Sequence, residues 1–251
     1  MLRYAATSIL KKLARKPEMN APLLNVAERN CHEDLKVIGN SIRIRDKLSG
    51  THMFAADSWD GLEALLEEAS GELDTFMVNT SEYGNEILRM FPGALTGEYN
   101  TYVMKKKDYL PCNLQLKGFE TSSLDLDWMD FIMSNYKDME FGNERYISDR
   151  ILNGPGMGLL YQGRKVAFAL QHKDGESGPL VVDMDFRGIG LGSELLMRFN
   201  RLLFERNSII FGLVKSGNLA SASMMVRSGY KKTKYNTLWV YRMKNGSLYL
   251  P

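Results

Sequence analysis

The sequence predicts a mixed fold of helices and strands, in the α/β (α+β) class. It is divided into an N-terminal domain of residues 1–108 and a C-terminal domain of residues 109–251. Apolar strand-like runs alternate with helices in the first half, whereas two strands of the second half are joined directly by a short turn. A chain of 251 residues is long enough for two modest domains. The order of the elements differs from that of a doubly wound sheet.

Three strands separated by two helices are predicted in the first half. The strands cover 51–56, 75–78 and 99–104, and the helices cover about 59–69 and 81–90. Phe91-Pro92-Gly93 ends the second helix, because proline cannot continue a helix and glycine permits the chain to turn. The charged run Lys105–Asp108, followed by Pro111, predicts an exposed strand end and a connector, and this places the domain boundary.

The second half is predicted to begin with a strand at 113–117 and two helices, at about 126–136 and through Tyr146 to Ile151. Strands at 158–161 and 166–171 flank the turn Gln162–Lys165, and a third strand ends near Val182. The remaining elements are a helix with apolar residues at helical spacing from Leu195 to Leu203, a strand at 208–214, a helix at 219–227, and a final pair of strands containing Trp239 and Tyr241.

Composition excludes several classes of protein. The 32 Lys and Arg against 30 Asp and Glu give a net charge of +2, which argues against a nucleic-acid partner. Cys31 and Cys112 form no CxxC pair, so neither a disulfide framework nor a metal site is expected, and a cytoplasmic location fits. No apolar run approaches the roughly 20 residues of a membrane span. The basic residues 1–17 predict an amphipathic surface helix rather than a transit peptide or a membrane anchor.

One glycine-rich segment, Arg187–Ser193, lies between a predicted strand and the start of a helix. The first amides of a helix have no partner inside it, and the helix dipole adds about half a positive charge there. Glycines let a phosphate approach the backbone closely, and Arg187 adds a full charge. A diphosphate is the expected ligand. A Rossmann loop would need a third glycine where Ser193 stands, and the GK[ST] of a Walker loop is absent.

This segment resembles the acyl-CoA loop, Arg-x-x-Gly-x-Gly, of the GNAT superfamily of N-acetyltransferases. Asn218, Ser221 and Gly229-Tyr230 are similar to the family's downstream Asn-x-x-Ala/Ser and Gly-Phe/Tyr pattern, and the resemblance spans about residues 112–243. It implies a GNAT-type central mixed, mostly antiparallel sheet flanked by helices, preceded by a partial, degenerate GNAT-like N-terminal domain. Acetyl-CoA or another acyl-CoA is the implied donor, without a metal.

The resemblance also implies the residues that bind the cofactor. The pantetheine arm pairs with the strand around Val181 and Val182, where that strand separates from the strand that begins near Ser208. The cofactor-binding residues are therefore expected to be Val181, Val182, Arg187, Gly188, Ile189, Gly190, Leu191, Gly192, Ser193, Asn218 and Ser221.

The turn Gly175-Glu176-Ser177-Gly178 resembles the Gly-Glu-x-Gly of the glycine N-acyltransferase-like branch, in which the Glu is the general base. Glu176 is therefore the candidate catalytic residue, and strand alternation places it on the same face as Val182. Asp183, Asp185 and His172 are weaker candidates. Met225 stands where many relatives have the Tyr that protonates the thiolate, so no general acid is identified.

The sequence thus predicts an acyl-CoA-dependent N-acetyltransferase that acts on a primary amine of a small molecule or amino acid, as a monomer or homodimer. Two alternatives stay open. One is an acyl-CoA-binding regulatory module without catalysis. The other is an aminoacyl transferase with two GNAT-like halves and a charged tRNA as donor, which the nearly neutral charge disfavours.

Overall fold

The computed structural model describes residues 9–111, 117–136, 143–244 and 247–248. Contacts between Cα atoms divide the chain into two compact units. Unit 1 contains Met1–Val103, Leu213–Asn218 and Lys232–Pro251, and unit 2 contains Met104–Gly212 and Leu219–Lys231. These units differ from ranges divided at residue 108, because the C-terminal segment from Lys232 onward groups with the N-terminal part of the chain.

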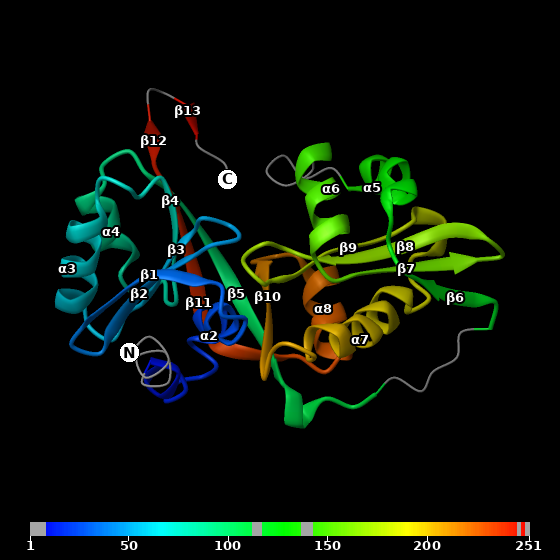
Figure 1. Cartoon of the computed structure of the whole chain (residues 1–251), viewed down its shortest axis with the longest axis horizontal. Coiled ribbons are helices and arrows are strands. Elements are labelled where there is room, and N and C mark those ends of the chain that lie inside the picture. Colours follow the sequence, from blue (N-terminus) through cyan, green and yellow to red (C-terminus); the bar gives the residue numbers. More distant parts are fainter. Residues whose placement is uncertain (1–8, 112–116, 137–142, 245–246, 249–251) are drawn as a thin grey trace. The chain divides into compact units, whose positions relative to one another are not determined.

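A seven-stranded sheet contains β1 (His32–Ile38), β2 (Ser41–Asp46), β3 (His52–Ala55), β4 (Thr75–Val78), β11 (Lys231–Tyr241), β5 (Leu95–Lys105) and β10 (Ile209–Lys215), in this order (Figure 1). β2 pairs antiparallel with β1 and β3, β3 pairs parallel with β4, and β11 pairs antiparallel with β4. The sheet is therefore mixed and mostly antiparallel, and β11 brings a late segment of the sequence next to early strands.

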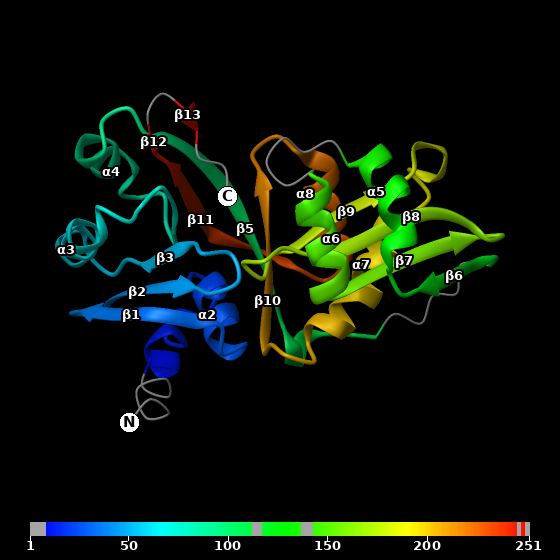
Figure 2. The ribbon, with the colours of Figure 1, turned by 45° about the horizontal axis from the view of Figure 1, so that its top comes forward.

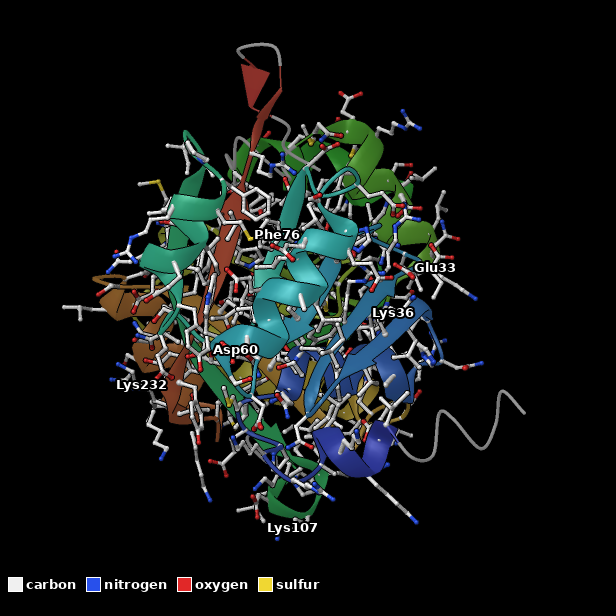
Figure 3. The ribbon with its side chains drawn as sticks, turned by 90° about the vertical axis from the view of Figure 1, so that its left-hand side faces the viewer. Glu33, Lys36, Asp60, Phe76, Lys107 and Lys232 are labelled. Carbon is white, nitrogen blue, oxygen red and sulfur yellow. The ribbon has the colours of Figure 1, made fainter. Side chains whose placement is uncertain are left out.

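Helices α3 (Trp59–Ala69) and α4 (Gly84–Met90) cover one face of β3 and β4, and α2 (Ala21–Glu28) lies on the other face (Figure 1). Apolar residues of α3 and α4 pack against Phe54, Phe76 and Val78. Figure 3 labels Phe76 beside the ribbon of α3 and Lys36 beside β1. Lys36 pairs at the surface with Glu68 of α3, at 2.7 Å. The apolar spacing of α3 thus builds the core of unit 1.

The second sheet lies in unit 2 and is antiparallel throughout. Its order is β6 (Phe119–Ser122), β7 (Gly156–Tyr161), β8 (Arg164–Gln171) and β9 (Ser177–Val182). Gln162 and Gly163 have φ values of 50° and 79°, the left-handed conformation that a tight turn between β7 and β8 requires. β9 is an edge strand, so one side of its backbone is available to a ligand.

Helices cover both faces of this four-stranded sheet (Figure 2). The turn η2 (Leu126–Trp128), α5 (Met129–Asn135) and α6 (Glu144–Asn153) pack on one face through Trp128, Ile132 and Ile147. α7 (Leu191–Leu203) packs on the other face, against β7, β8 and β9, and contacts α8 (Leu219–Arg227). The short turns η1 (Lys106–Asp108) and η3 (Met184–Phe186) and the ladder of β12 (Met243–Lys244) with β13 (Ser247–Leu248) complete the described elements.

The structure confirms the α+β fold class with a mixed, mostly antiparallel sheet and flanking helices. It adds β1, β2, β6 and α2, which were not predicted. The expected final pair of strands is wrong, since Trp239 and Tyr241 both lie on the single long strand β11. Residues 113–116 of the strand expected at 113–117 lie outside the described residues, and Lys117 lies in a turn. The start of the N-terminal helix also lies outside them, and residues 9–13 of it are helical. No helix among the described residues is long and apolar enough to cross a membrane.

Candidate functional site

A glycine-rich loop leads from η3 into α7. Gly188 and Gly190 have φ values of 82° and 92°, and Gly190 is the N-cap residue of the helix. A side chain disfavours this left-handed backbone, so glycine suits both positions. Within the described parts of the chain, the amides from Gly188 to Ser193 donate to no protein acceptor. The loop therefore presents a row of unsatisfied N–H groups at a helix N-terminus.

These amides border a groove of about 500 Å³. One wall is the end of β9, from Leu180 to Val182, and the opposite wall is α8. The groove is lined by Asn135, Leu180, Val181, Val182, Phe186, Arg187, Gly188, Gly190, Leu191, Gly192, Ser193, Ala220, Ser221, Ser223, Met224 and Arg227. The described residues of unit 2 thus bring most of the predicted cofactor-binding positions to one hollow.

The pairing of β9 with β8 decides which backbone groups face this groove. The amide of Asp183 donates to Val166 O at 2.8 Å, so in the register Phe168↔Val181 the N–H and C=O of Val181 point toward β8. Those of Leu180 and Val182 point away from it, along the free edge. The Nε of Arg187 donates to the carbonyl of Val182 at 2.9 Å. Val181 therefore lines the groove without offering it backbone hydrogen bonds.

Two guanidinium groups line the groove. Arg187 precedes the glycines, and Arg227 lies in the last turn of α8; both side chains are exposed. Sequence reasoning identified Arg187 and missed Arg227. In the sequence, Arg227 stands two residues before the glycine that ends α8. This position indicates a binding residue only once α8 is known to form a wall of the groove. Two positive charges and a helix N-terminus on one surface favour an anionic ligand over a cationic one.

Three predicted cofactor-binding positions have other surroundings. Ile189 is 59% exposed and is not part of the lining. Leu191 is buried and anchors the first turn of α7, although it borders the groove. Asn218 belongs to unit 1 and precedes α8, where its amide donates to Lys215 O at 3.1 Å. The structure brings Ser221, but not Asn218, to the groove.

Glu176 lies in the turn between β8 and β9. Gly175 has a φ of 95°, and the amide of Glu176 donates to Asp174 Oδ1 at 3.0 Å. β9 begins only at Ser177, and its register shifts at Gln171. The alternation that placed Glu176 and Val182 on one face therefore does not extend to Glu176. Glu176 is half-buried and is not among the residues that line the groove.

Two tyrosines flank this turn, and burial raises the pKa of both. The hydroxyl of Tyr146, on α6, lies 2.7 Å from His172 Nδ1 and accepts from the amide of Lys173 at 3.3 Å. Burial is the largest cause of its raised pKa, and the negative charges of Asp174 and Glu176 add to it. Tyr146 thus stays protonated and fixes the turn that carries Glu176.

Tyr230 is buried, and its hydroxyl lies 2.9 Å from Ser177 Oγ and 2.8 Å from Asn200 Oδ1. Since the carbonyl oxygen of Asn200 only accepts, Tyr230 donates to Asn200 and Ser177 donates to Tyr230. Burial raises the pKa of Tyr230, and the charge of Glu176 adds to this. The carboxylate of Glu176 therefore lies within electrostatic range of the hydroxyls of Tyr146 and Tyr230.

The two acidic residues after β9 have structural partners. Asp183 accepts from the amide of Asp185 at 3.0 Å, and Arg164 pairs with Asp183 at 2.8 Å and with Asp185 at 3.2 Å. The amide of Asp185 and then Arg164 hold the pKa of Asp183 below its ordinary value. These contacts fix the approach to the glycine loop and leave both carboxylates occupied. The described residues contain no group of three or more His, Cys, Asp or Glu arranged to hold a metal ion.

Residues 156–240 match the family model described as "FR47-like protein". Among solved structures, a Drosophila protein has a TM-score of 0.69 at 14% identity and covers 97% of both chains. A GCN5-related N-acetyltransferase from Kribbella flavida has a TM-score of 0.58 at 13% identity, over 91% of this chain and 96% of its own. A GCN5-related N-acetyltransferase-like protein from Streptococcus suis has 0.53 at 16%, over 94% and 99%. Comparison with curated proteins finds no significant match.

These likenesses show that the chain has the fold of GCN5-related N-acetyltransferases over nearly its whole length. The FR47-like match covers β7 to β11 and contains the groove's glycine loop, β9, α7 and α8. At 13–16% identity the structures show the fold alone.

Proposed function

We propose that the chain is an acyl-CoA-dependent N-acyltransferase that moves an acetyl group from acetyl-CoA to a primary amine of a small molecule or amino acid. The observation that carries this proposal is the groove in which unsatisfied amides at the start of α7 meet the free edge of β9. The proposal includes action in the cytoplasm, which fits a chain with only two cysteines.

The diphosphate of coenzyme A fits the loop. Amides from Gly188 to Ser193 donate to its oxygens, and Arg187 and Arg227 neutralise its charge from two sides of the groove. The pantetheine arm then lies along β9 as an added strand, hydrogen-bonded to the backbone of Leu180 and to the amide of Val182. Because the carbonyl of Val182 already accepts from Arg187, it is not a partner of the arm.

The chemistry is direct attack on the thioester. The amine nitrogen bonds to the carbonyl carbon, the carbonyl oxygen becomes an oxyanion, and the carbon–sulfur bond breaks to release the thiolate. A backbone amide on the free edge of β9 stabilises the oxyanion. A thiol of pKa about 8.5 leaves as thiolate at neutral pH for only about 2 kcal/mol, so the buried, apolar Met225 in place of a phenol does not prevent turnover.

The amine must first lose a proton. For an amine of pKa about 10.4 this costs roughly 4 to 5 kcal/mol at neutral pH, so a base is useful. Glu176 is the proposed base and acts through a water molecule, because it does not line the groove itself. Its turn resembles that of glycine N-acyltransferase-like proteins, which favours the amino group of an amino acid as acceptor.

The same position of Glu176 outside the lining favours one alternative, an acyl-CoA-binding regulatory module. Thermal shift with CoA and acetyl-CoA tests the groove. A panel of amines, followed by release of free thiol from acetyl-CoA, tests the chemistry. Binding with thiol release supports the transferase, whereas binding without release from any amine supports the regulatory module. Absence of CoA binding contradicts both.

A further inference from the structure

The length of the pantetheine arm fixes where the acyl group lies. This inference rests on the proposed function. About eleven chain atoms separate the diphosphate oxygen from sulfur, which is the length of about four residues, or roughly 14 Å when extended. A strand rises about 3.3 Å per residue, so an arm that starts beside Val182 and follows β9 backward brings its sulfur near Gly178. The acyl group then lies beside Ser177, at the start of the strand.

Met225 occupies the space behind that point. Its side chain is 3% exposed and lies over Gly212 of β10, so that a β-carbon on Gly212 would overlap Met225 Cε and lie 3.4 Å from Sδ. The same β-carbon would lie 3.8 Å from the carbonyl oxygen of Ser177. Gly212, Met225 and the first residue of β9 therefore meet at one place, within unit 2.

The neighbouring residue shows how this place relates to the groove. Met224 lines the groove, and its Sδ would lie 3.2 Å from a β-carbon on Gly192, beside Leu180 and Val182. Met225 is the next residue of α8 and is buried behind this wall. A buried thioether side chain thus lies beside the start of β9, one residue along α8 from the wall of the groove.

We propose that Met225 sets the length of the acyl chain that the groove accepts, by filling the space beyond the thioester carbonyl. A methyl group ends in contact with the thioether, whereas a chain of four to six carbons needs the volume that Met225 Sδ and Cε occupy over Gly212. A methionine side chain is flexible, but in a close-packed site it has no empty volume to move into. The protein is therefore specific for short acyl groups, and one side chain determines this specificity.

The test measures binding, since it then needs no acceptor amine. Dissociation constants of CoA, acetyl-CoA and hexanoyl-CoA are determined by calorimetry for the wild type and for Met225→Ala, which deletes three heavy atoms. We expect the wild type to prefer acetyl-CoA. In Met225→Ala the affinity for hexanoyl-CoA relative to acetyl-CoA rises about tenfold, because added methylenes gain a buried site. Affinity for CoA itself stays the same.

Met225→Val is the second variant, because it opens less space and loses less packing. A smaller rise of the same ratio is expected, and this variant decides the question if Met225→Ala does not fold. Met53→Ala is the matched control: Met53 is fully buried in β3 of unit 1, so its loss lowers stability without changing the ratio.

An unchanged ratio in variants that still bind CoA overturns the role of Met225 and leaves the proposed function standing. A wild type that prefers hexanoyl-CoA also overturns it. A wild type that fails to bind CoA overturns the proposed function, and the role of Met225 falls with it.

Discussion

Gly190 offers a sharp test of the amide loop, because its replacement by alanine perturbs the backbone without a steric clash. Its φ is 92° and its ψ is −1°, and a β-carbon there would meet no atom within 4 Å. The cost therefore comes from the left-handed backbone alone, about 1–2 kcal/mol. For a chain of this size that lowers the Tm by roughly 2–8 °C. The variant should remain folded.

We expect Gly190→Ala to impair CoA binding more than it impairs folding. The new methyl group stands at the N-cap of α7, where the diphosphate must approach the amides, and a backbone that relaxes toward negative φ turns those amides away. We expect CoA affinity to fall at least about tenfold, or about 1.4 kcal/mol. Calorimetry with CoA measures the affinity, and differential scanning calorimetry measures the Tm.

Gly163 provides the matched control. It also has a left-handed backbone, with φ of 79°, and a β-carbon there meets no atom within 4 Å, but it lies in the β7–β8 turn outside the groove lining. Gly163→Ala should lose a similar Tm and keep wild-type affinity for CoA. The reasoning is refuted if Gly190→Ala binds CoA as tightly as Gly163→Ala does.

Three further predictions concern charges. Arg187→Ala should weaken CoA binding and flatten its dependence on salt, measured by calorimetry at two salt concentrations; an unchanged salt dependence would contradict a phosphate contact. Glu176→Gln should lower amine acylation about a hundredfold at neutral pH, with CoA affinity unchanged, and the deficit should narrow as the amine deprotonates at high pH; equal rates at all pH values would remove Glu176 as base. Because its surroundings hold the pKa of Asp183 below its ordinary value of 3.8, Asp183 stabilises the fold above that pH and the contribution disappears as the pH falls through the folded-state pKa. The Tm difference between wild type and Asp183→Asn should therefore be present at neutral pH and shrink as the pH falls below 3.8; a constant difference would contradict this contribution.

The sequence predicted those parts of the fold that depend on local pattern. α7 carries its apolar residues at helical spacing, and Leu195 and Phe199 are fully buried as expected. β1 and β2 were missed. β1 is an edge strand with a charged sequence, HEDLKVI, and its exposed positions follow no regular alternation. β11 was divided in two, since the pairing that extends it involves β4, which is distant in the sequence.

The site was likewise predictable where it depends on local sequence. Its amide loop is a local feature, and the structure places that loop beside a groove that is also lined by the predicted strand. Arg227 and the outward backbone of Leu180 depend on tertiary packing and on strand register, which no spacing rule supplies. The contact of Met225 with Gly212 joins a helix to a strand and could not be seen in the sequence. The predicted alternation from Val182 to Glu176 failed because a register shift intervenes.

A crystal structure of the chain with acetyl-CoA is the most direct test of the central claim. We expect diphosphate oxygens within hydrogen-bonding distance of the amides between Gly188 and Ser193, and the pantetheine arm against the backbone of Leu180. Acetyl-CoA bound elsewhere, or a loop whose amides are already satisfied by protein, would contradict the account.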